Sequence, residues 1–320
     1  MTRKYSLSKR IRLAAETPLL RLGLVVVPRL PRRVILVLAR VLGTLGYYLS
    51  TRSRRFGLEN LDLAFGDEKT PAEKRRILRQ ALRNFLLVML DLLWFTRDSA
   101  VRMERWFVPE PDFKASMDRP GAKVGVTAHF GNWEMAGRYW SLASGAMMSV
   151  AMPVKNPKVD DLIHRLRENT GQQIVARQGA LKKLLRHLRD GGIVGLLLDQ
   201  NTKPADGGIF VTFFGRPVAV SPAAGVLAAR TGAEIVIGFA LPQPDGSYRG
   251  EMPHCIAPEE IAAIPPKDAA REITQRITSF YEETIRARPD YWLWSYRRWR
   301  YIPAGMSAEG FPSYARPAGD

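Results

Sequence analysis

The chain has 320 residues, of which 46% are hydrophobic and 25% charged, and it carries a formal charge of +17. This composition excludes disordered, collagen-like and disulfide-built proteins, and the length allows one large α/β domain with an appendage. A single cysteine, Cys255, excludes an internal disulfide. The basic balance favours an acidic partner, which could be nucleic acid, an anionic membrane surface, or a negatively charged substrate or carrier protein.

The N-terminal region is apolar from Leu19 to Leu49 but is interrupted by arginines and prolines between Arg21 and Arg40. No uninterrupted apolar run reaches the roughly 20 residues of a confident membrane span. Cations precede and follow the segment, which favours insertion in, or attachment to, an anionic leaflet. We therefore expect residues 1–55 to form an N-terminal membrane-associated helical segment. The alternative is a pair of buried helices in a soluble protein.

The next element is a helix from Thr70 to about Arg97. Thr70 as N-cap, Pro71 at the first helical position and Glu73 at the third form a capping box before an amphipathic run. Irregular chain rich in proline follows. The short apolar run Val124–Ala128 then predicts a buried strand, and His129 stands directly after it.

Strands and helices alternate over the rest of the chain, which predicts an α/β fold with a mainly parallel central sheet flanked by helices. We expect residues 56–305 to form one domain that contains these strands and helices. Residues 306–320 are expected to form a loose tail. The predicted elements are a strand at Met147–Met152, helices at Val159–Glu168 and Ala180–Asp190, a strand at Ile193–Leu198, a helix at Ser221–Thr231, a strand at Glu234–Ala240 and a helix at Asp268–Arg288.

The stretch from His129 to Glu134 carries the most specific chemistry. Five residues along one helix would place the two side chains about 140° apart, so a strand end, a turn and a helix start are needed to bring them together. Gly131 allows the turn, and Asn132 can cap a helix that begins near Trp133. Glu134 in the first helical turn would be ionised and would orient His129 as a general base.

The nucleophile in this scheme is a hydroxyl of the substrate, because no G-x-S-x-G elbow is present and Cys255 has no catalytic context. Backbone N–H groups at the Gly131–Asn132 turn, or a nearby cation, are candidate donors to an oxyanion. The alternative is a hydrogen-bonded structural histidine and a capping glutamate. The other histidines have no ligand-like spacing, and no nucleotide-binding loop is visible, so neither a metal nor a cofactor is predicted.

Five motifs in chain order carry a resemblance to a known family. They are His129–Glu134, Pro153–Pro157, Arg177–Leu181, Asp199-Gln200 with Phe213–Pro217, and Pro289–Arg300. Together they resemble the bacterial lipid A biosynthesis acyltransferases, a group with an H-x-x-x-x-D/E motif within the glycerolipid acyltransferase-like proteins. The resemblance extends over nearly the whole chain.

This resemblance implies an enzyme anchored on the cytoplasmic face of the inner membrane. It implies acyl-acyl carrier protein as donor and a phosphorylated glucosamine lipid, a lipid A precursor, as acceptor. His129 would take the proton of the acceptor hydroxyl, Glu134 would orient His129, and the pantetheine thiolate would leave. The residues expected to bind substrate are Asn132, Lys155, Arg177, Asp199, Gln200, Arg297 and Arg298. The cations among them are expected to contact a phosphate group or the oxyanion.

One departure from the family pattern leaves the acceptor open, because Ala151-Met152 stands where the family has Tyr-Arg before the proline. Another glycolipid, such as a phosphatidylinositol mannoside, is therefore an alternative acceptor. A basic nucleic-acid-binding protein and a non-catalytic membrane scaffold are the alternatives outside the enzymes. No nucleic-acid-binding module is visible, although Tyr291–Arg300 could stack on bases or lie at a membrane interface.

Overall fold

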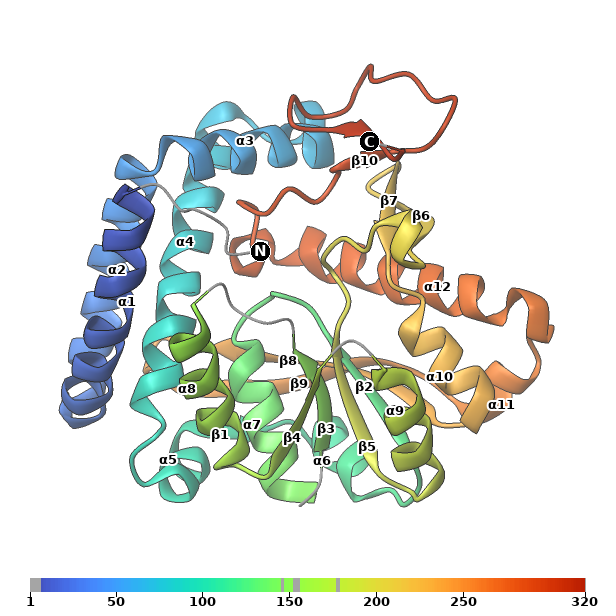
Figure 1. The fold of residues 1–320 in the computed structure, drawn as a ribbon, viewed down its shortest axis with the longest axis horizontal. Coiled ribbons are helices and arrows are strands. Elements are labelled where there is room, and N and C mark those ends of the chain that lie inside the picture. The colour runs from blue at the N-terminus through green and yellow to red at the C-terminus, as the bar shows by residue number, and fades with distance from the viewer. Residues whose placement is uncertain (1–6, 145–146, 152–155, 177–178, 320) are drawn as a thin grey trace.

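The computed structural model describes residues 7–144, 147–151, 156–176 and 179–319, with side chains from residue 16 onward (Figure 1). The α-helices of these residues are α1 (Leu7–Val26), α2 (Arg32–Leu49), α3 (Thr51–Phe65), α4 (Pro71–Trp94), α5 (Ser99–Trp106), α6 (Pro111–Asp118), α7 (Trp133–Ser144), α8 (Pro157–Glu168), α9 (Ala180–Arg189), α10 (Ala223–Thr231), α11 (Pro258–Ala262) and α12 (Pro266–Ala287). The strands are β1 (Phe107–Pro109), β2 (Lys123–Thr127), β3 (Met147–Ala151), β4 (Gln172–Ala176), β5 (Ile193–Leu197), β6 (Ile209–Phe213), β7 (Arg216–Val220), β8 (Glu234–Pro242), β9 (Tyr248–Ile256), β10 (Tyr301–Ile302) and β11 (Arg316–Pro317).

A seven-stranded sheet organises the molecule, with the strand order β1-β9-β8-β2-β5-β3-β4. Every neighbouring pair in it is parallel except β8 and β9, which are antiparallel. The prediction of a mainly parallel central sheet flanked by helices is confirmed. The antiparallel β6–β7 hairpin and strand β9 were not predicted, because their residues carry no clear alternation of apolar and polar side chains.

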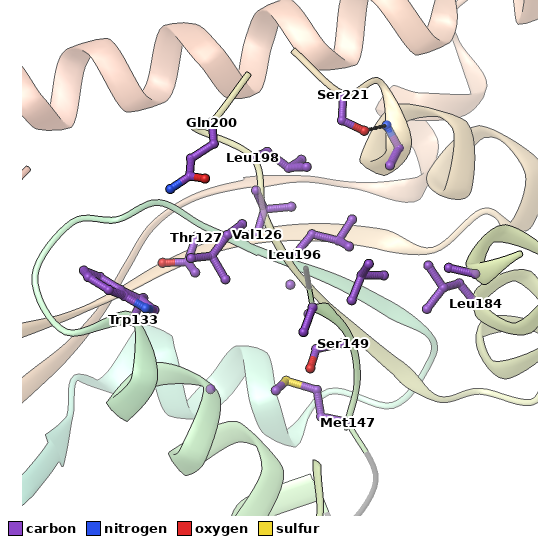
Figure 2. A pocket seen from close by; sticks show the side chains of 18 of the residues that line it. Val126, Thr127, Trp133, Met147, Ser149, Leu184, Leu196, Leu198, Gln200 and Ser221 are labelled. Carbon is purple, nitrogen blue, oxygen red and sulfur yellow. Dashed lines mark hydrogen bonds between the residues drawn. The ribbon is translucent and has the colours of Figure 1, made fainter. Parts of the chain in front are cut away.

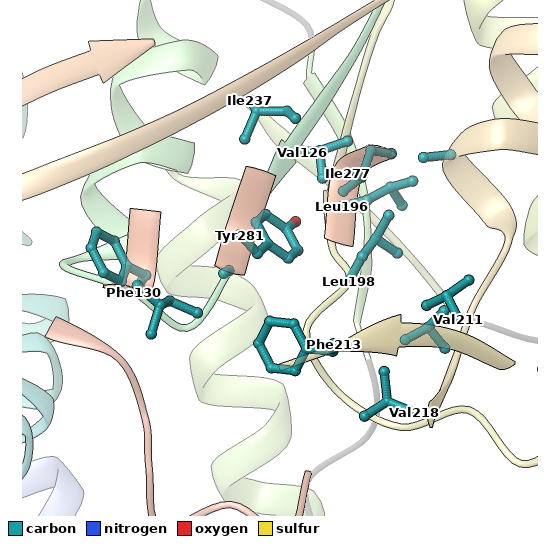
Figure 3. Packing of buried hydrophobic residues seen from close by; sticks show 14 of the residues in the cluster. Val126, Phe130, Leu196, Leu198, Val211, Phe213, Val218, Ile237, Ile277 and Tyr281 are labelled. Atoms are coloured by element: carbon teal, nitrogen blue, oxygen red, sulfur yellow. The ribbon is translucent and has the colours of Figure 1, made fainter. Parts of the chain in front are cut away.

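The two faces of the sheet pack differently along β2. Val124 and Val126 join a core that includes α10 and α12, and Figure 3 shows Val126 and Ile237 beside Ile277 and Tyr281 of α12. Gly125 faces the other side, where a Cβ atom would lie 1.9 Å from the ring of Trp140. The absence of a side chain at this position therefore lets α7 approach the sheet closely, and α6 packs beside α7.

Helix α4 confirms its predicted capping box, in which the Glu73 N–H donates to the Thr70 hydroxyl and the Thr70 N–H donates to the Glu73 carboxylate. Helix α2 packs along α4, and α3 also contacts both. The predicted boundary at residue 55 falls inside α3, whose Leu61 and Phe65 belong to the main core. The N-terminal helices are thus built into the same body as the sheet.

The length and apolarity of the helices bear on the predicted N-terminal membrane segment. Among the described residues, no single helix combines the length and apolarity of a membrane span. The segments Arg32–Leu49 and Thr51–Glu68 reach that composition only together, and they are bent by 89° relative to each other.

Residues 306–319 of the predicted C-terminal tail (306–320) contact the rest of the chain. Strand β11 pairs with β10, the Ser313 hydroxyl donates to Glu59 of α3, and the Tyr314 hydroxyl donates to the Asn60 side chain. Proline and glycine in this segment therefore mark turns of a packed loop.

Candidate active site

A pocket of about 860 Å³ opens at the carboxyl ends of β2 and β5, where ligands bind in many open α/β sheets (Figure 2). Strand β3 pairs with β5 only from Met147 to Ser149 and then continues beside β4. Leu196, Leu197 and Leu198, beyond this pairing, line the pocket. Its walls are mainly apolar, and polar side chains gather near His129.

His129 and Asp199 meet because their strands are neighbours in register. Thr127 of β2 pairs with Leu197 of β5, and each of the two polar residues stands two positions further along its own chain. The Asp199 carboxylate is 2.8 Å from His129 Nδ1 through one oxygen and accepts the His129 backbone N–H at 2.9 Å through the other. Two contacts to one carboxylate fix both the backbone and the ring of His129.

Asp199 is buried and remains ionised. Burial by itself would raise the pKa of Asp199, but its interactions with His129, with the Trp292 indole and with the charge of Arg298 outweigh burial and hold this pKa below its usual value. Trp292 Nε1 donates to Asp199 at 2.9 Å from the C-terminal segment. An ionised acceptor at Nδ1 places the ring proton on that nitrogen and leaves Nε2 as the basic one.

Nε2 of His129 is directed into the pocket, 3.1 Å from the amide nitrogen of Gln200. With the proton on Nδ1, the Gln200 amide donates and Nε2 accepts. A substrate hydroxyl that reaches Nε2 therefore replaces the Gln200 amide. Of the residues expected to bind substrate, Gln200 lines the pocket, and Asp199 lies behind the histidine.

Glu134 has a different partner from the one predicted. Its carboxylate accepts from Arg167 Nη2 at 2.6 Å and from Arg167 Nε at 3.1 Å, and Trp133 Nε1 donates to it at 3.2 Å. Burial would raise the pKa of Glu134, but Arg167 outweighs it and holds this pKa below its usual value. The expected contact with His129 is corrected, because Asp199 occupies Nδ1 and α8 brings Arg167 to the carboxylate.

The turn between His129 and Glu134 has the predicted form but not the predicted donors. Gly131 has a φ of +59°, and the Asn132 side chain caps α7 by accepting the Met135 N–H at 3.1 Å. The N–H groups of Gly131 and Asn132 donate to the carbonyls of Tyr291 and Ala240. Neither group is therefore free to stabilise an oxyanion, which corrects that expectation.

Asn132 is buried and does not line the pocket, and its predicted role in binding substrate stays a prediction. Its amide donates to the Tyr248 hydroxyl at 2.9 Å and to Asp91 at 3.4 Å. Asp91 of α4 in turn forms a buried ion pair with Arg32 of α2. The turn between His129 and Glu134 is thus tied to the N-terminal helices through a buried polar network.

The predicted cations have different positions. Lys155 and Arg177 lie outside the described residues. Arg298 is only 1% exposed and stacks over Phe213, and Arg297 lies over the Phe56 ring. Neither lines the pocket, and their phosphate contacts stay a prediction. Trp292, Trp294 and Trp299 are also buried, which places the three tryptophans of Tyr291–Arg300 in the core instead of on bases or a membrane.

Two side chains that bind the buried carboxylates were not predicted, Arg167 and Trp292. Arg167 belongs to an amphipathic helix whose basic residues resemble ordinary surface charges, so the sequence offers no signal for it. Trp292 stands in a recognised motif, but its partner, Asp199, follows the distant strand β5. Among the described side chains, no group of three or more His, Cys, Asp or Glu residues could hold a metal ion.

Comparison with known proteins agrees with the sequence motifs. Residues 9–301 match the family described as bacterial lipid A biosynthesis acyltransferase. The chain is 26% identical over 289 residues to the lipid A biosynthesis lauroyltransferase of Escherichia coli, covering 88% of this chain and 90% of the relative. It is also 26% identical over 287 residues to the palmitoleoyltransferase of the same organism, covering 88% and 89%.

Two further comparisons are more limited. A lipid A biosynthesis acyltransferase of Haemophilus influenzae is 30% identical over 149 residues, which cover 46% of this chain and 44% of the relative. The crystal structure of the 1-acyl-sn-glycerophosphate acyltransferase PlsC from Thermotoga maritima aligns with 81% of this chain and 99% of that chain, at 14% identity and a TM-score of 0.37.

Proposed function

The chain belongs to the bacterial lipid A biosynthesis acyltransferase family and is an O-acyltransferase, and we propose that it moves a fatty acyl chain from acyl-acyl carrier protein to a hydroxyl of a lipid A precursor. The observation that carries the proposal is the arrangement of His129. Its Nδ1 is held by ionised Asp199, and its Nε2 faces the pocket.

The reaction proceeds by direct transfer. The acceptor hydroxyl gives its proton to His129 Nε2 while its oxygen attacks the carbonyl carbon of the thioester. The tetrahedral intermediate then collapses, the carbon–sulfur bond breaks, and the imidazolium returns the proton to the departing pantetheine thiolate. Asp199 stabilises the imidazolium and keeps the ring in one orientation, as the third member of a base-and-orienter arrangement does.

Stabilisation of the oxyanion is assigned to side chains, because the Gly131 and Asn132 N–H groups already donate to backbone carbonyls. When the acceptor hydroxyl takes the place of the Gln200 amide at Nε2, that amide becomes free to donate to the developing negative charge. Arg167 also lines the pocket, and Glu134 holds its guanidinium by a bidentate contact. In this scheme Glu134 acts through Arg167, which presents a positive charge to the thioester oxygen or to an acceptor phosphate.

A membrane-facing surface is assigned to α1 and α2, which supports a location at the cytoplasmic face of the inner membrane. On α2, Val34, Val37, Val41, Leu45 and Tyr48 recur at helical spacing and are exposed. Leu19, Leu22 and Val25 are further exposed apolar side chains, on α1. Exposed Arg33 and Arg40 flank it, so the face suits the interface of an anionic bilayer.

Activity is tested with labelled acyl-acyl carrier protein and a tetra-acylated lipid A precursor in detergent. His129→Ala is expected to lower kcat by at least about 10²-fold, because the general base is lost. His254→Ala is the matched control, since His254 lies on β9 and does not line the pocket. A wild type that acylates only a phosphatidylinositol mannoside would overturn the acceptor, and an active His129→Ala would overturn the mechanism.

Membrane attachment is tested by flotation with vesicles that contain phosphatidylglycerol. Val37→Asp/Val41→Asp on α2 is expected to reduce the bound fraction severalfold, because charges enter the apolar face. Val101→Asp/Val108→Asp is the control, since these valines are exposed to a similar extent on α5 and β1. Equal binding of the two variants would exclude the α1–α2 face as the attachment surface.

A further inference from the structure

Helix α9 concentrates positive charge on one exposed face. Lys182, Lys183, Arg186 and Arg189 are all exposed, while Leu184, Leu185 and Leu188 are buried beneath them. None of these four cations forms an ion pair with a carboxylate among the described residues. From Lys182 to Arg189 the helix advances about 10 Å, so the four charges occupy one compact patch, which we call the α9 basic face.

The inner side of the same helix belongs to the pocket. Ala180, Leu181 and Leu184 line it, and Figure 2 shows Leu184 directed from α9 toward the residues of β5. Leu181 is 41% exposed and also lines the pocket, so the first turn of α9 stands at the pocket rim. A single helix therefore presents cations to solvent and apolar side chains to the space that leads to His129.

Other exposed cations lack this connection. Arg75 and Arg76 of α4 are exposed and also lack a carboxylate partner among the described residues. No α4 residue lines the pocket, and α4 packs on α2 and α3, the helices next to the proposed membrane-facing surface. Both α9 and α4 therefore carry exposed positive charge, and α9 differs from α4 by its position at the pocket rim.

We propose that the α9 basic face docks the acidic protein that delivers the acyl thioester. An acidic carrier bound there is held by charge complementarity, which acts mainly on the rate and affinity of encounter. Its flexible thioester arm then passes the first turn of α9, the acyl chain enters beside Leu184, and the thioester carbonyl approaches His129. This inference rests on the proposed function, because it takes acyl-acyl carrier protein as the donor.

The test reverses charge on the α9 basic face and separates the two substrates. Lys182→Glu/Arg186→Glu is compared with wild type and with Arg75→Glu/Arg76→Glu, which makes the same charge change on α4. Initial rates are measured against acyl-carrier protein concentration at saturating lipid acceptor, and against acceptor concentration at saturating donor. The α9 variant is expected to raise KM for the acyl-carrier protein about tenfold or more and to leave kcat and the acceptor KM unchanged.

Each other result overturns the docking site. An unchanged donor KM, an equal rise in the α4 variant, or a rise confined to the lipid acceptor would each exclude carrier docking on α9. If Lys182→Glu/Arg186→Glu lowers kcat, the milder variant Lys183→Gln/Arg189→Gln is measured in its place. An unchanged donor KM in this second variant also excludes carrier docking on α9. If wild type uses acyl-acyl carrier protein and the α9 variants have the same donor KM, only the docking proposal is wrong. If wild type does not use acyl-acyl carrier protein, the proposed donor is wrong as well.

Discussion

Two buried carboxylates stand in the same site and have opposite kinds of partner. Asp199 accepts from His129 and Trp292, whereas Glu134 accepts from Arg167 and Trp133. In both cases burial works to raise the pKa of the carboxyl, and its partners outweigh burial and lower it. The Asp199 side thereby creates a base that faces the pocket, and the Glu134 side creates a fixed cation.

This comparison teaches that closeness in sequence does not select the partner of His129. Glu134 is five positions from His129, yet its carboxylate is bound to a residue of α8. Asp199 is 70 positions away, but its strand is hydrogen-bonded to the strand of His129 in register. Adjacent parallel strands bring their carboxyl ends together, and that geometry decides the contact.

Asp199→Asn gives the largest expected effect. An Asn amide can donate to Nδ1, which moves the ring proton to Nε2 and removes the basic nitrogen from the pocket. We expect kcat to fall by about 10³-fold to 10⁴-fold, as replacement of a triad carboxylate does elsewhere. The same acyl-transfer assay measures it, with circular dichroism to verify folding. Near-normal turnover would show that His129 needs no anionic partner, and the comparison would then fail.

The fold was largely predictable from local pattern. The capping box of α4, the buried strands β2 and β5, and the turn at Gly131 with its Asn132 cap all follow from short-range rules. These features depend on neighbours within a few residues, and the sequence shows such neighbours directly.

The pairing within the site was not predictable by the same rules. Strand order determines that β5, not β3, lies beside β2, and no single segment encodes that order. A usable signal did exist, since His129 and Asp199 each follow a buried apolar run. The side chains of Arg298 and Trp292 resembled surface groups because their motif is basic and aromatic, but tertiary packing buries them.

Arg167→Met tests the other half of the comparison. It leaves the Glu134 carboxylate buried without its cation, and breaking such a pair costs about 3–5 kcal/mol of unfolding free energy at pH 7. Denaturant unfolding in detergent measures the loss. The pKa of Glu134 rises without Arg167, so the loss should shrink as the pH falls and this carboxyl becomes protonated.

The double variant Glu134→Gln/Arg167→Met serves as the control for this pair. It removes both charges, so its loss of stability at pH 7 is expected to be smaller than that of Arg167→Met alone. Equal losses in the single and double variants would mean that Glu134 does not depend on Arg167 for its ionisation.

Trp292→Phe gives the smallest expected effect and returns to Asp199. It removes one hydrogen bond to an ionised carboxylate, which costs about 1.5–3 kcal/mol at pH 7. The folded pKa of Asp199 lies below its unfolded value of about 3.9, so this carboxyl stabilises the fold above that pH and loses its contribution as pH falls through the folded pKa. The cost of Trp292→Phe should therefore diminish in acid.

Trp294→Phe is the matched comparison for that last measurement, because Trp294 is equally buried but its indole donates to the neutral carbonyl of Pro289. Its cost should stay constant between pH 7 and about pH 3, since neither partner titrates in that range. Parallel pH profiles for the two variants would mean that Trp292 only fills space. Divergent profiles would show that the C-terminal segment helps keep Asp199 ionised, and that the base is positioned from a part of the chain far from its own motif.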